Sequence, residues 1–373
     1  MHLKSIDLLN YRNYTKLGLN FSPSLNIILG DNAQGKTNIL EAIHLLSLGK
    51  SHRTHLSREL ISWEATFSCI RGKAIRGGKE TCVELMIGED GLSRIKINGA
   101  LKRRVGDLIG YINAVLFCPE DLKIVKEGPE GRRGFIDDVI SQVHSQYYFW
   151  RQRYLRCLRQ RNALLKQIAV QQREPSALDM WDKHLIETGT RIIIQRERII
   201  RRLCKYSDEA YRRMTGGKGG DNLHLTYLCE LIEDDPTPGK IESRFELELE
   251  GKRDLEIERG MTLVGPHRDD LLIQVNGVDM RTFGSQGEQR TSSLALRLGQ
   301  WELIKEETKD FPVLLLDDAL SELDEKRRTF LMEMIEEDAQ TIITSTNPVY
   351  FAPQHLKDAN LFRIEGGQVS HDV

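Results

Sequence analysis

The spacing of apolar and polar residues divides the chain into three stretches, of which the first is rich in β-strands. Within the first 120 residues, apolar runs at 3–9 and 25–29 predict strands. The pair Asn98-Gly99 between two apolar residues predicts a two-residue hairpin turn. Residues 37–48 carry apolar side chains at helical spacing shortly after the second strand. The pattern therefore predicts a β-rich region that contains an early strand–loop–helix unit.

The second stretch has the periodicity of long helices. From Phe135 to Ile168, apolar residues recur every three or four positions, which predicts one helix of about 35 residues. Pro175 then interrupts the pattern, and Ser176 is placed to cap a second helix that runs from 178 to 214. Two long helices joined by a short break form an αα-hairpin.

The third stretch returns to the strand and helix pattern of the start. Strands are predicted at 224–229, 245–249, 261–264 and 271–275, followed by a hairpin turn at Asn276-Gly277. A helix at 285–308, a buried strand at 311–316, a helix at 325–337 and a strand at 341–344 complete the pattern. We therefore expect one discontinuous α/β domain, residues 1–118 and 250–373, interrupted by a helical lobe at 119–249.

Charge changes this picture because it is unevenly distributed. The 373 residues include 53 Lys and Arg against 55 Asp and Glu, a formal net charge of −2. Residues 151–215 hold 16 Lys and Arg against 7 Asp and Glu, a local net charge of +9, which leaves −11 (−2 minus 9) for the rest. A protein that coats nucleic acid non-specifically is usually strongly basic. Any nucleic-acid contact is therefore expected on the basic helical lobe.

Several classes of protein are excluded by the composition and by the N-terminal segment. No run of 18 apolar residues predicts a membrane span, and the N-terminal apolar run is broken by Asp7, Asn10 and Arg12. The six cysteines are scattered without a C-x-x-C pair. They predict reduced thiols in a cytoplasmic protein rather than a zinc site or a disulfide framework.

The loop after the strand at 25–29 carries the first chemical signature. It matches G-x-x-x-x-G-K-[ST] with Gly30, Asp31, Asn32, Ala33, Gln34, Gly35, Lys36 and Thr37. Backbone N–H groups of such a loop surround phosphate oxygens at a helix N-terminus, where the helix dipole favours an anion. Lys36 is expected to reach the β- and γ-phosphates, and the Thr37 hydroxyl is expected to bind Mg²⁺. The pattern predicts a nucleotide-binding loop.

A second metal ligand is expected on a neighbouring strand. Four apolar residues at 313–316 end in Asp317 and Asp318, as in a buried parallel strand whose carboxyl end faces the phosphates. Asp317 is the expected Mg²⁺ ligand, and Asp318 is the candidate base for the attacking water. A strand that ends in Asp is common by itself, but beside the phosphate loop it indicates a phosphoryl-transfer site.

Two further motifs are weak when each is taken alone. Ser285, Gly287 and Gln289 lie at the start of the helix at 285–308, where a plain N-cap is the simpler interpretation and a phosphate contact is the alternative. Ser321 and Asp324 follow the carboxylate strand in the sequence S-E-L-D. The order and spacing of all four motifs make them informative together.

This set of motifs resembles that of ABC-type ATPase heads. The 248 residues between Lys36 and Ser285 leave no room for the long coiled coils of the chromosome-maintenance ATPases. The short insertion is similar to that of the RecF family. Local sequences support the resemblance at LNYRNY (9–14), GKSHRT (49–54), PEDLKIVKEGPEGRRGFID (119–137), GPHRDDL (265–271) and LLLDDALSELD (314–324).

The resemblance implies an α/β fold, an ABC-type P-loop ATPase head with a mixed sheet and helices, interrupted by the basic helical lobe. It implies that ATP and Mg²⁺ bound by one copy are enclosed by Ser285 and Gly287 of a second copy, so that ATP drives dimerisation into a DNA clamp. Slow, DNA-dependent ATP hydrolysis would release the clamp. It further implies action at single-strand gaps and single-strand/double-strand junctions in recombinational repair and replication, with RecO and RecR as partners in loading RecA and in SOS induction.

The sequence departs from the ABC-type pattern at three places. Asp318 stands where most heads carry Glu, and its side chain is one methylene shorter, which predicts slow hydrolysis. No Gln occurs at 118–121, where the lid loop is expected, and Ser345-Thr346-Asn347 contains no His to sense the γ-phosphate. These differences favour a timing switch over a fast motor.

Several other basic residues are candidates for contacts. Arg12 and Arg53 are candidates for contacting phosphate or base, and His267 and Arg268 are as consistent with supporting a turn as with a functional role. A solvated helix face is the simpler interpretation of the basic lobe, but residues 151–173 contain no acid, which favours phosphates as the counter-charge. The DNA candidates are Lys102, Arg103, Arg104, Arg132, Arg133, Arg151, Arg153, Arg156 and Arg159.

Two other functions stay open on the sequence alone. A transport-type ATPase head predicts a docking surface for a membrane subunit and no affinity for DNA. A nucleotide-gated DNA-binding scaffold predicts ATP binding without significant catalysis.

Overall fold

The chain folds into two compact units in the computed structural model, which describes residues 1–216, 221–233, 236–335 and 339–371. The first unit contains Met1–Leu122, Tyr206–Asn222 and Gln286–Val373, and the second contains Lys123–Lys205 and Leu223–Ser285. The predicted boundary after residue 118 lies near the first division. The predicted return to the ATPase domain at residue 250 is wrong, because the chain up to Ser285 packs within the second unit.

The first unit contains an antiparallel six-stranded sheet with the order β2-β1-β4-β5-β6-β7. Its strands are β1 (His2–Tyr11), β2 (Tyr14–Asn20), β4 (Phe67–Arg76), β5 (Lys79–Gly88), β6 (Gly91–Ile97) and β7 (Ala100–Lys102). Every second residue of β4 from Ser68 to Ala74 is buried, so one face of the strand packs in the core. Asn98 and Gly99 both have positive φ in the turn between β6 and β7, and the predicted hairpin is confirmed.

A second sheet of the same unit has the order β15-β14-β3-β13-β12-β8. Its strands are β3 (Leu25–Leu29), β8 (Ala114–Phe117), β12 (Val313–Asp317), β13 (Thr341–Ser345), β14 (Asn360–Glu365) and β15 (Gln368–His371). The five strands from β14 to β8 are parallel, and only β15 pairs in the antiparallel sense. All residues of β8, β12 and β13 are buried, as expected for parallel strands covered on both faces. The sheet joins strands from both ends of the chain, as the sequence predicts.

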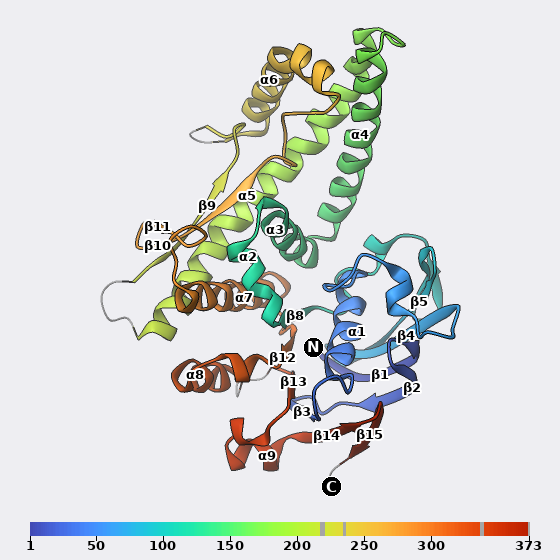
Figure 1. The fold of residues 1–373 in the computed structure, drawn as a ribbon, viewed down its shortest axis with the longest axis vertical. Helices are drawn as coiled ribbons and strands as arrows, with labels where there is room; N and C mark the ends of the chain where they lie inside the picture. Colours follow the sequence, from blue (N-terminus) through green and yellow to red (C-terminus); the bar gives the residue numbers. More distant parts are fainter. Residues whose placement is uncertain (217–220, 234–235, 336–338, 372–373) are drawn as a thin grey trace. The chain divides into compact units, whose positions relative to one another are not determined.

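Helix α1 (Lys36–Leu48) lies between the two sheets (Figure 1). It contacts β8, β12 and β13 of the parallel sheet and β4 and β5 of the antiparallel sheet. Eleven of its 13 residues are buried, so the helix has hardly any solvated face. One core cluster includes residues of both sheets and of this helix. Because α1 begins at the phosphate loop, packing against both sheets fixes the position of that loop.

The other helices of the first unit follow the parallel strands. They are α7 (Gln286–Thr308), α8 (Glu325–Ile335) and α9 (Pro353–Asp358), with the 3₁₀ helices η1 (Ser57–Leu60), η2 (Val105–Asp107), η3 (Pro119–Asp121), η5 (Ala319–Glu322) and η6 (Pro348–Tyr350). Helix α7 contacts β8, and α9 contacts β3. The predicted helix at 285–308 is confirmed, and so is the one at 325–337 as far as Ile335, beyond which residues 336 and 337 lie outside the described part.

The second unit is mainly helical and contains one small sheet (Figure 1). Its elements are α3 (Pro129–Val143), α4 (Ser145–Ala169), η4 (Pro175–Leu178), most of α5 (Asp179–Thr215), α6 (Pro238–Arg259) and the antiparallel strands β9 (Leu223–Leu228), β10 (Asp270–Val275) and β11 (Val278–Asp279); α2 (Leu122–Lys126) precedes them. The predicted single helix from Phe135 is two helices, because His144 adopts φ −132° and ψ 88°, outside the helical region. Helices α4 and α5, joined through η4, form the predicted αα-hairpin.

The predicted strands at 245–249 and 261–264 are wrong. Alternating apolar residues near Phe245 suggested a strand, but the segment lies in α6, which has Pro at its first turn and Gly260 in a left-handed C-cap. Within α6 the buried residues Ile241, Phe245 and Leu249 are four positions apart and form one helix face, and α6 contacts α4. A short alternating run cannot distinguish a strand from a helix whose apolar residues are sparse.

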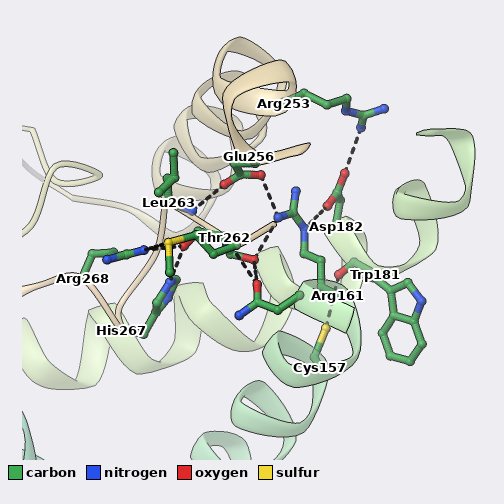
Figure 2. A network of polar contacts seen from close by, with 12 residues as sticks. Cys157, Arg161, Trp181, Asp182, Arg253, Glu256, Thr262, Leu263, His267 and Arg268 are labelled. Carbon is green, nitrogen blue, oxygen red and sulfur yellow. Dashed lines mark hydrogen bonds and ion pairs between the residues drawn. The ribbon is translucent and has the colours of Figure 1, made fainter. Parts of the chain in front are cut away.

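A buried arginine organises the polar core of the second unit (Figure 2). Arg161 is fully buried, and its Nε donates to Asp182 Oδ1 at 2.6 Å while its Nη1 donates to Thr262 Oγ1 at 2.9 Å and pairs with Glu256 Oε2 at 2.7 Å. Arg253 donates to the other oxygen of Asp182 at 2.9 Å. The basic lobe therefore neutralises part of its charge internally, through carboxylates that are distant in the sequence.

The segment 265–271 also has a structural role in this unit. His267 contacts Tyr154 Oη through Nδ1 at 2.6 Å and the carbonyl of Thr262 through Nε2 at 3.1 Å, so Nε2 donates and Nδ1 accepts from the tyrosine hydroxyl. Arg268 donates to the same Thr262 carbonyl at 3.0 Å. The pair therefore supports the turn that precedes β10, which is one of the two roles left open by the sequence.

Two buried groups of this segment, His267 and Asp269, make the folding stability of the second unit depend on pH, and their effects have opposite signs. Burial lowers the pKa of His267 to about 4 and raises the pKa of Asp269 to about 6. Below pH 6.5 the unfolded chain protonates His267 more readily than the folded chain, so this histidine costs stability as the pH falls. Asp269 binds a proton in the folded state first, so it contributes stability below about pH 6, and that contribution is lost as the pH rises.

We expect His267→Gln to become more stable relative to the wild type as the pH falls from 7 to 4.5, by about 2–3 kcal/mol at pH 4.5. The reason is that the variant lacks the group whose protonation opposes folding. Denaturant unfolding of both proteins across this range measures the difference. Asp269→Asn is the matched control and should lose stability relative to the wild type over the same range. A difference between His267→Gln and the wild type that does not change with pH would contradict the assignment.

Candidate nucleotide-binding site

The phosphate loop connects the end of β3 to the start of α1. Gly35 has φ 110°, in the region that favours glycine, and a Cβ there would lie 2.5 Å from Asn13 Nδ2 and 2.6 Å from Tyr14 Oη. A Cβ at Gly30 would lie 2.6 Å from the carbonyl oxygen of Ile364. Close packing therefore favours glycine at both positions, and backbone conformation adds to this at Gly35.

Lys36 closes this loop with its ammonium group. Its Nζ donates to the carbonyls of Gly30 at 2.7 Å and Asp31 at 2.8 Å. Burial lowers the pKa of Lys36, against the raising influence of Asp318 and Asp317. A lysine ammonium has three donors, so this geometry holds the side chain in place and leaves one donor for an anion in the loop.

Asp317 is the point at which three segments meet. Its Oδ1 accepts a hydrogen bond from Thr37 Oγ1 at 2.9 Å and one from Thr344 Oγ1 at 2.8 Å. Burial raises the pKa of Asp317, although both threonine hydrogen bonds lower it. The structure thus brings the predicted pair Thr37 and Asp317 together, and the hydroxyl and carboxylate oxygens form a donor set that suits a hard cation such as Mg²⁺.

Thr344 is a site residue that the sequence analysis missed. It lies in β13 opposite Asp317 in the parallel register, and its hydroxyl accepts from the Asp318 backbone N–H at 3.0 Å while contacting Asp317. The available signal was a hydroxyl near the carboxyl end of the strand at 341–344. It could be used only once this strand was known to be the direct neighbour of the carboxylate strand.

Asp318 follows in an unusual backbone conformation. Its φ is 50° and its ψ is 19°, the left-handed region that a residue with a side chain rarely adopts. Within the described residues, its buried Oδ1 has no hydrogen-bond partner. A carboxylate oxygen held in this way next to Asp317 is available as an acceptor, which is consistent with the predicted base.

Arg12 and Arg53 make protein contacts rather than pointing into the phosphate loop. Arg12 forms a bidentate ion pair with the buried Glu41, at 2.9 Å from Nε and 2.6 Å from Nη2, and Arg53 donates to Asn38 Oδ1 at 2.9 Å. Burial alone would raise the pKa of Glu41, but hydrogen bonds from Arg12 and Ser51 outweigh it and lower that pKa. Arg12 thus joins the turn after β1 to helix α1.

A cavity of about 590 Å³ lies beside this ion pair. Its wall includes Asn13, whose side chain donates to the Gln34 carbonyl of the phosphate loop at 3.0 Å. Trp63 stands at the cavity with 94% of its side chain exposed. Arg58 holds the turn that carries Trp63 by donating to the carbonyls of Ser62, Trp63 and Ala65 at 3.3, 2.7 and 3.1 Å. Asn13 therefore connects the cavity wall to the phosphate loop, and Arg58 holds the backbone of the turn that carries Trp63.

The remaining predicted motif residues lie at helix starts and loops. Ser285 and Gly287 are exposed at the start of α7, whereas Gln289 is buried in that helix. Ser321 Oγ donates to the Asp318 carbonyl at 2.7 Å, and Asp324 Oδ1 accepts from the Arg327 N–H at 2.9 Å at the start of α8. Asp324 is therefore a helix cap in this structure.

The turn at 119–121 is held by an ion pair that the sequence did not indicate. Asp121 accepts from the Cys118 N–H at 3.0 Å and from Arg297 Nε at 2.9 Å. The turn lies where the ABC-type pattern has its lid glutamine. An arginine of α7 therefore holds the carboxyl end of β8.

The DNA candidates differ in accessibility. Arg132 is buried in a bidentate ion pair with Asp270, at 2.7 and 2.8 Å, so its prediction as a surface contact is wrong. Arg151 pairs with Asp137 at 2.6 Å, and Arg133 donates to the Asp269 carbonyl at 2.8 Å. Lys102, Arg133 and Arg151 are half-buried, and the five exposed candidates are Arg103, Arg104, Arg153, Arg156 and Arg159.

Two kinds of feature are absent from the described ranges, a metal-binding cluster and a membrane-spanning helix. Between residues 1 and 371, outside the gaps given above, no group of three His, Cys, Asp or Glu side chains is arranged to hold a metal ion. Over the same residues, no helix combines the length and the apolar character needed to cross a membrane.

Known proteins resemble the chain over its whole length. The family model of the RecF/RecN/SMC N-terminal domain matches residues 2–363. A DNA replication and repair protein RecF from an Exiguobacterium species is 41% identical over 370 residues, and one from Halalkalibacterium halodurans is 39% identical over 370 residues; each alignment covers 99% of both chains.

Solved structures agree with the sequence comparisons. The recombination mediator protein RecF-ATP in the RecFOR pathway is 34% identical, with a TM-score of 0.91 over 100% of this chain and 98% of its own. An Smc head bound to a domain of ScpA is 16% identical with a TM-score of 0.54, which shows a shared fold only. The predicted fold class, an ABC-type α/β head, is confirmed, and the chain belongs to the RecF family of DNA replication and repair proteins.

Proposed function

We propose that the protein is an ATP-dependent DNA-binding protein of replication and recombinational repair, in which ATP drives dimerisation on DNA and slow hydrolysis ends it. The observation that carries the proposal is the arrangement of Lys36, Thr37 and Asp317 around the start of α1. A structure titled RecF-ATP, from a relative 34% identical to this chain, supports ATP as the nucleotide.

In this proposal the phosphates lie in the loop from Gly30 to Thr37. The backbone N–H groups and the start of α1 favour the negative charge, and Lys36 uses its remaining donor on the β- and γ-phosphates. Thr37 and Asp317 would hold Mg²⁺, which neutralises phosphate charge when it is bound. Thr344 keeps Asp317 oriented, because its hydroxyl contacts the carboxylate directly.

The nucleoside would occupy the cavity beside the loop. Trp63 offers an aromatic face for stacking on the base, and Arg12 and Arg53 support the wall through Glu41 and Asn38. Of the two contacts considered for these arginines, phosphate or base, this assignment leaves them on the side of the nucleoside. It is supported by the hydrogen bond from Asn13 to the phosphate loop, which places the cavity next to the proposed phosphate site.

Hydrolysis would depend on Asp318. The water oxygen attacks the γ-phosphorus, its proton passes to Asp318, and the bond to ADP breaks with the electron pair leaving on ADP. The shorter carboxylate, the missing lid glutamine and the missing histidine support a slow reaction. Slow hydrolysis suits a switch whose ATP-bound lifetime matters more than its turnover.

Dimerisation would place Ser285 and Gly287 of one copy on the γ-phosphate held by the other. Both residues are exposed at the N-terminal end of α7, where a helix favours an anion. ATP then becomes part of the interface, so that loss of the γ-phosphate weakens the dimer. Gln289 is buried, which favours a supporting role within α7.

The DNA-contacting surface would be the exposed basic residues of the helical lobe. Arg153, Arg156 and Arg159 are three positions apart on α4 and are exposed, and the segment 151–173 has no acid of its own. Lys102, Arg103 and Arg104 offer a second basic cluster after β6. Arg133 and Arg151 make internal contacts and are weaker candidates.

The family suggests where the switch acts. Relatives of the chain are DNA replication and repair proteins, and one solved relative is a recombination mediator protein in the RecFOR pathway. We therefore infer action in the cytoplasm at single-strand gaps or single-strand/double-strand junctions. RecR and RecO would be the protein partners, RecA loading the outcome, and SOS induction the downstream response.

ATP-dependent dimerisation and DNA binding are tested together by Ser285→Arg. We expect the wild type to dimerise and to bind gapped DNA with ATP, and the variant to remain monomeric and to bind equally weakly with and without ATP, because an arginine side chain blocks the close approach to the partner's phosphate. Light scattering and fluorescence anisotropy give the two readouts. Leu247→Arg, at an exposed position of α6, controls for the added charge. Equal dimerisation and binding of Ser285→Arg and the wild type with ATP would remove the clamp mechanism.

The nucleoside cavity is tested by Trp63→Ala. We expect ATP affinity to fall about 10-fold or more, because stacking of a base on an aromatic ring contributes about 1–3 kcal/mol. Affinity for inorganic tripolyphosphate should not change, since it has no base. Isothermal titration of both probes measures the difference, and Trp63→Phe is the matched variant that retains a stacking surface. Equal losses for the two probes would show that Trp63 supports the loop instead of the base.

A nucleotide-gated scaffold remains a second candidate, because Asp318 is short and the usual lid glutamine and γ-phosphate-sensing histidine are missing. The ATPase proposal predicts that Asp318→Asn lowers phosphate release about 100-fold or more with little change in ATP affinity, as expected for loss of a general base. A phosphate-release assay with gapped DNA distinguishes the two. Asp90→Asn, at an exposed turn, is the control for loss of a carboxylate. Identical rates for Asp318→Asn and the wild type would favour the scaffold.

A further inference from the structure

Two loops border the acidic pair at the end of β12. One runs from Asp318 to Leu323 after β12, and the other runs from Asn347 to Tyr350 after β13. The strands that carry them are parallel neighbours, with Asp317 opposite Thr344. The first loop carries Asp318 itself, and the second follows the strand whose Thr344 accepts from the Asp318 N–H.

The loop after β12 is held in part by its own hydrogen bonds. The N–H and the hydroxyl of Ser321 both donate to the Asp318 carbonyl, at 3.2 and 2.7 Å. These contacts form a tight turn that accommodates the left-handed conformation of Asp318. Such a conformation costs about 1–3 kcal/mol and persists only where neighbouring contacts determine it. Outside this turn, the Asp318 N–H donates to Thr344 Oγ1 of β13 at 3.0 Å.

Arg328 of α8 supplies a connection to the rest of the unit. Its Nε donates to the Leu320 carbonyl at 3.1 Å and its Nη2 donates to the Leu323 carbonyl at 3.0 Å. The two acceptors lie on either side of the Ser321 turn. The planar, forked guanidinium can reach both carbonyls at once, which a lysine ammonium on a flexible stem does less well.

The same guanidinium contacts the second loop. Its Cζ lies 4.6 Å from the centre of the Tyr350 ring, a cation–π arrangement. Tyr350 belongs to η6, which begins after Asn347, where the Asn347 side chain accepts from the Val349 N–H at 2.9 Å. Ser345 Oγ in turn donates to the Asn347 carbonyl at 3.1 Å. Arg328 thus contacts both loops. The loop after β13 is in turn hydrogen-bonded to Ser345, the residue of β13 that follows Thr344.

The adjacent Arg327, also in α8, has contacts of a different kind from those that join Arg328 to both loops. Arg327 contacts Asp324, three residues before it, through an ion pair and through the backbone N–H at 2.9 Å. Both contacts are local to the start of α8. Arg327 and Arg328 have the same chemistry on the same helix turn but different connections, so they form a matched pair for an experiment.

We propose that Arg328 is a positioning residue for hydrolysis, which fixes the loop carrying Asp318 to the loop after β13. The inference rests on the proposed ATP hydrolysis and goes beyond it by assigning a residue that touches neither nucleotide nor metal. The inference predicts that loss of Arg328 lowers the rate of hydrolysis without weakening ATP binding. Loss of Arg328 leaves the phosphate loop, Thr37 and Asp317 unchanged, and it releases Asp318 from its position.

The experiment compares Arg328→Lys with Arg327→Lys in the full-length protein. We expect Arg328→Lys to lower kcat for phosphate release about 10- to 100-fold, as a small misplacement of a reacting group does, with an ATP Kd within about twofold of the wild type. Hydrogen exchange of the amides at 319–324 should become faster in Arg328→Lys without nucleotide. Arg327→Lys should match the wild type in all three measurements. Tyr350→Phe should also match it, because the ring is retained, and Tyr350→Leu should accelerate exchange in the same loop.

The exchange measurement separates failure of this inference from failure of the proposed function. If the wild type releases no phosphate, the ATPase proposal fails, and selective acceleration of exchange at 319–324 would still support the role of Arg328 in holding the loop. Wild-type exchange and wild-type kcat in Arg328→Lys would overturn the inference. Faster exchange throughout β12 and β13 would overturn it as well, because Arg328 would then stabilise the unit as a whole.

Discussion

The position of the Asp317 carboxylate is the constraint on which the rest of the site depends. Two threonine hydroxyls, from α1 and β13, donate to the same oxygen of this buried group. Each comes from a different segment, so the contact exists only if the parallel register of β3, β13 and β12 and the packing of α1 are correct. The burial of α1 between two sheets supplies that accuracy. A nucleotide site here is therefore a consequence of core packing and not only of a loop motif.

The buried arginines of the helical unit also depend on partners that tertiary packing brings close to them. The excess of Lys and Arg favoured phosphates as the counter-charge, yet Arg132, Arg161 and Arg196 are buried and paired with carboxylates. A buried charge without a partner is costly, so each of these arginines requires its acid. The basic surface available to DNA is correspondingly smaller than the net charge of the segment suggests. It is concentrated on exposed positions such as Arg153, Arg156 and Arg159.

The left-handed backbone conformation of Asp318 has a cost in folding free energy, and it occurs at the residue proposed as the base. A residue with a side chain adopts this conformation at a cost, and the surrounding contacts from Ser321, Thr344 and Arg328 offset it. Thr344 and Ser321 contact the backbone of Asp318 itself, and Arg328 contacts the same loop at the Leu320 carbonyl. The slow reaction proposed for a short carboxylate is thus compatible with a loop held in place, because a short base would lower the rate even where its backbone is well positioned.

The sequence by itself determined the phosphate loop, the carboxylate strand, the hairpin turns and the family, because each depends on glycine, periodicity or short spacing along the chain. It did not determine the helix around Phe245, the pairing of Arg132 with Asp270, or the role of Thr344. Arg132 and Asp270 are 138 residues apart, and Thr344 matters only as the strand neighbour of Asp317. The physical reason is that a local pattern reports backbone preference, whereas the partner of a buried charge or hydroxyl is chosen by tertiary packing.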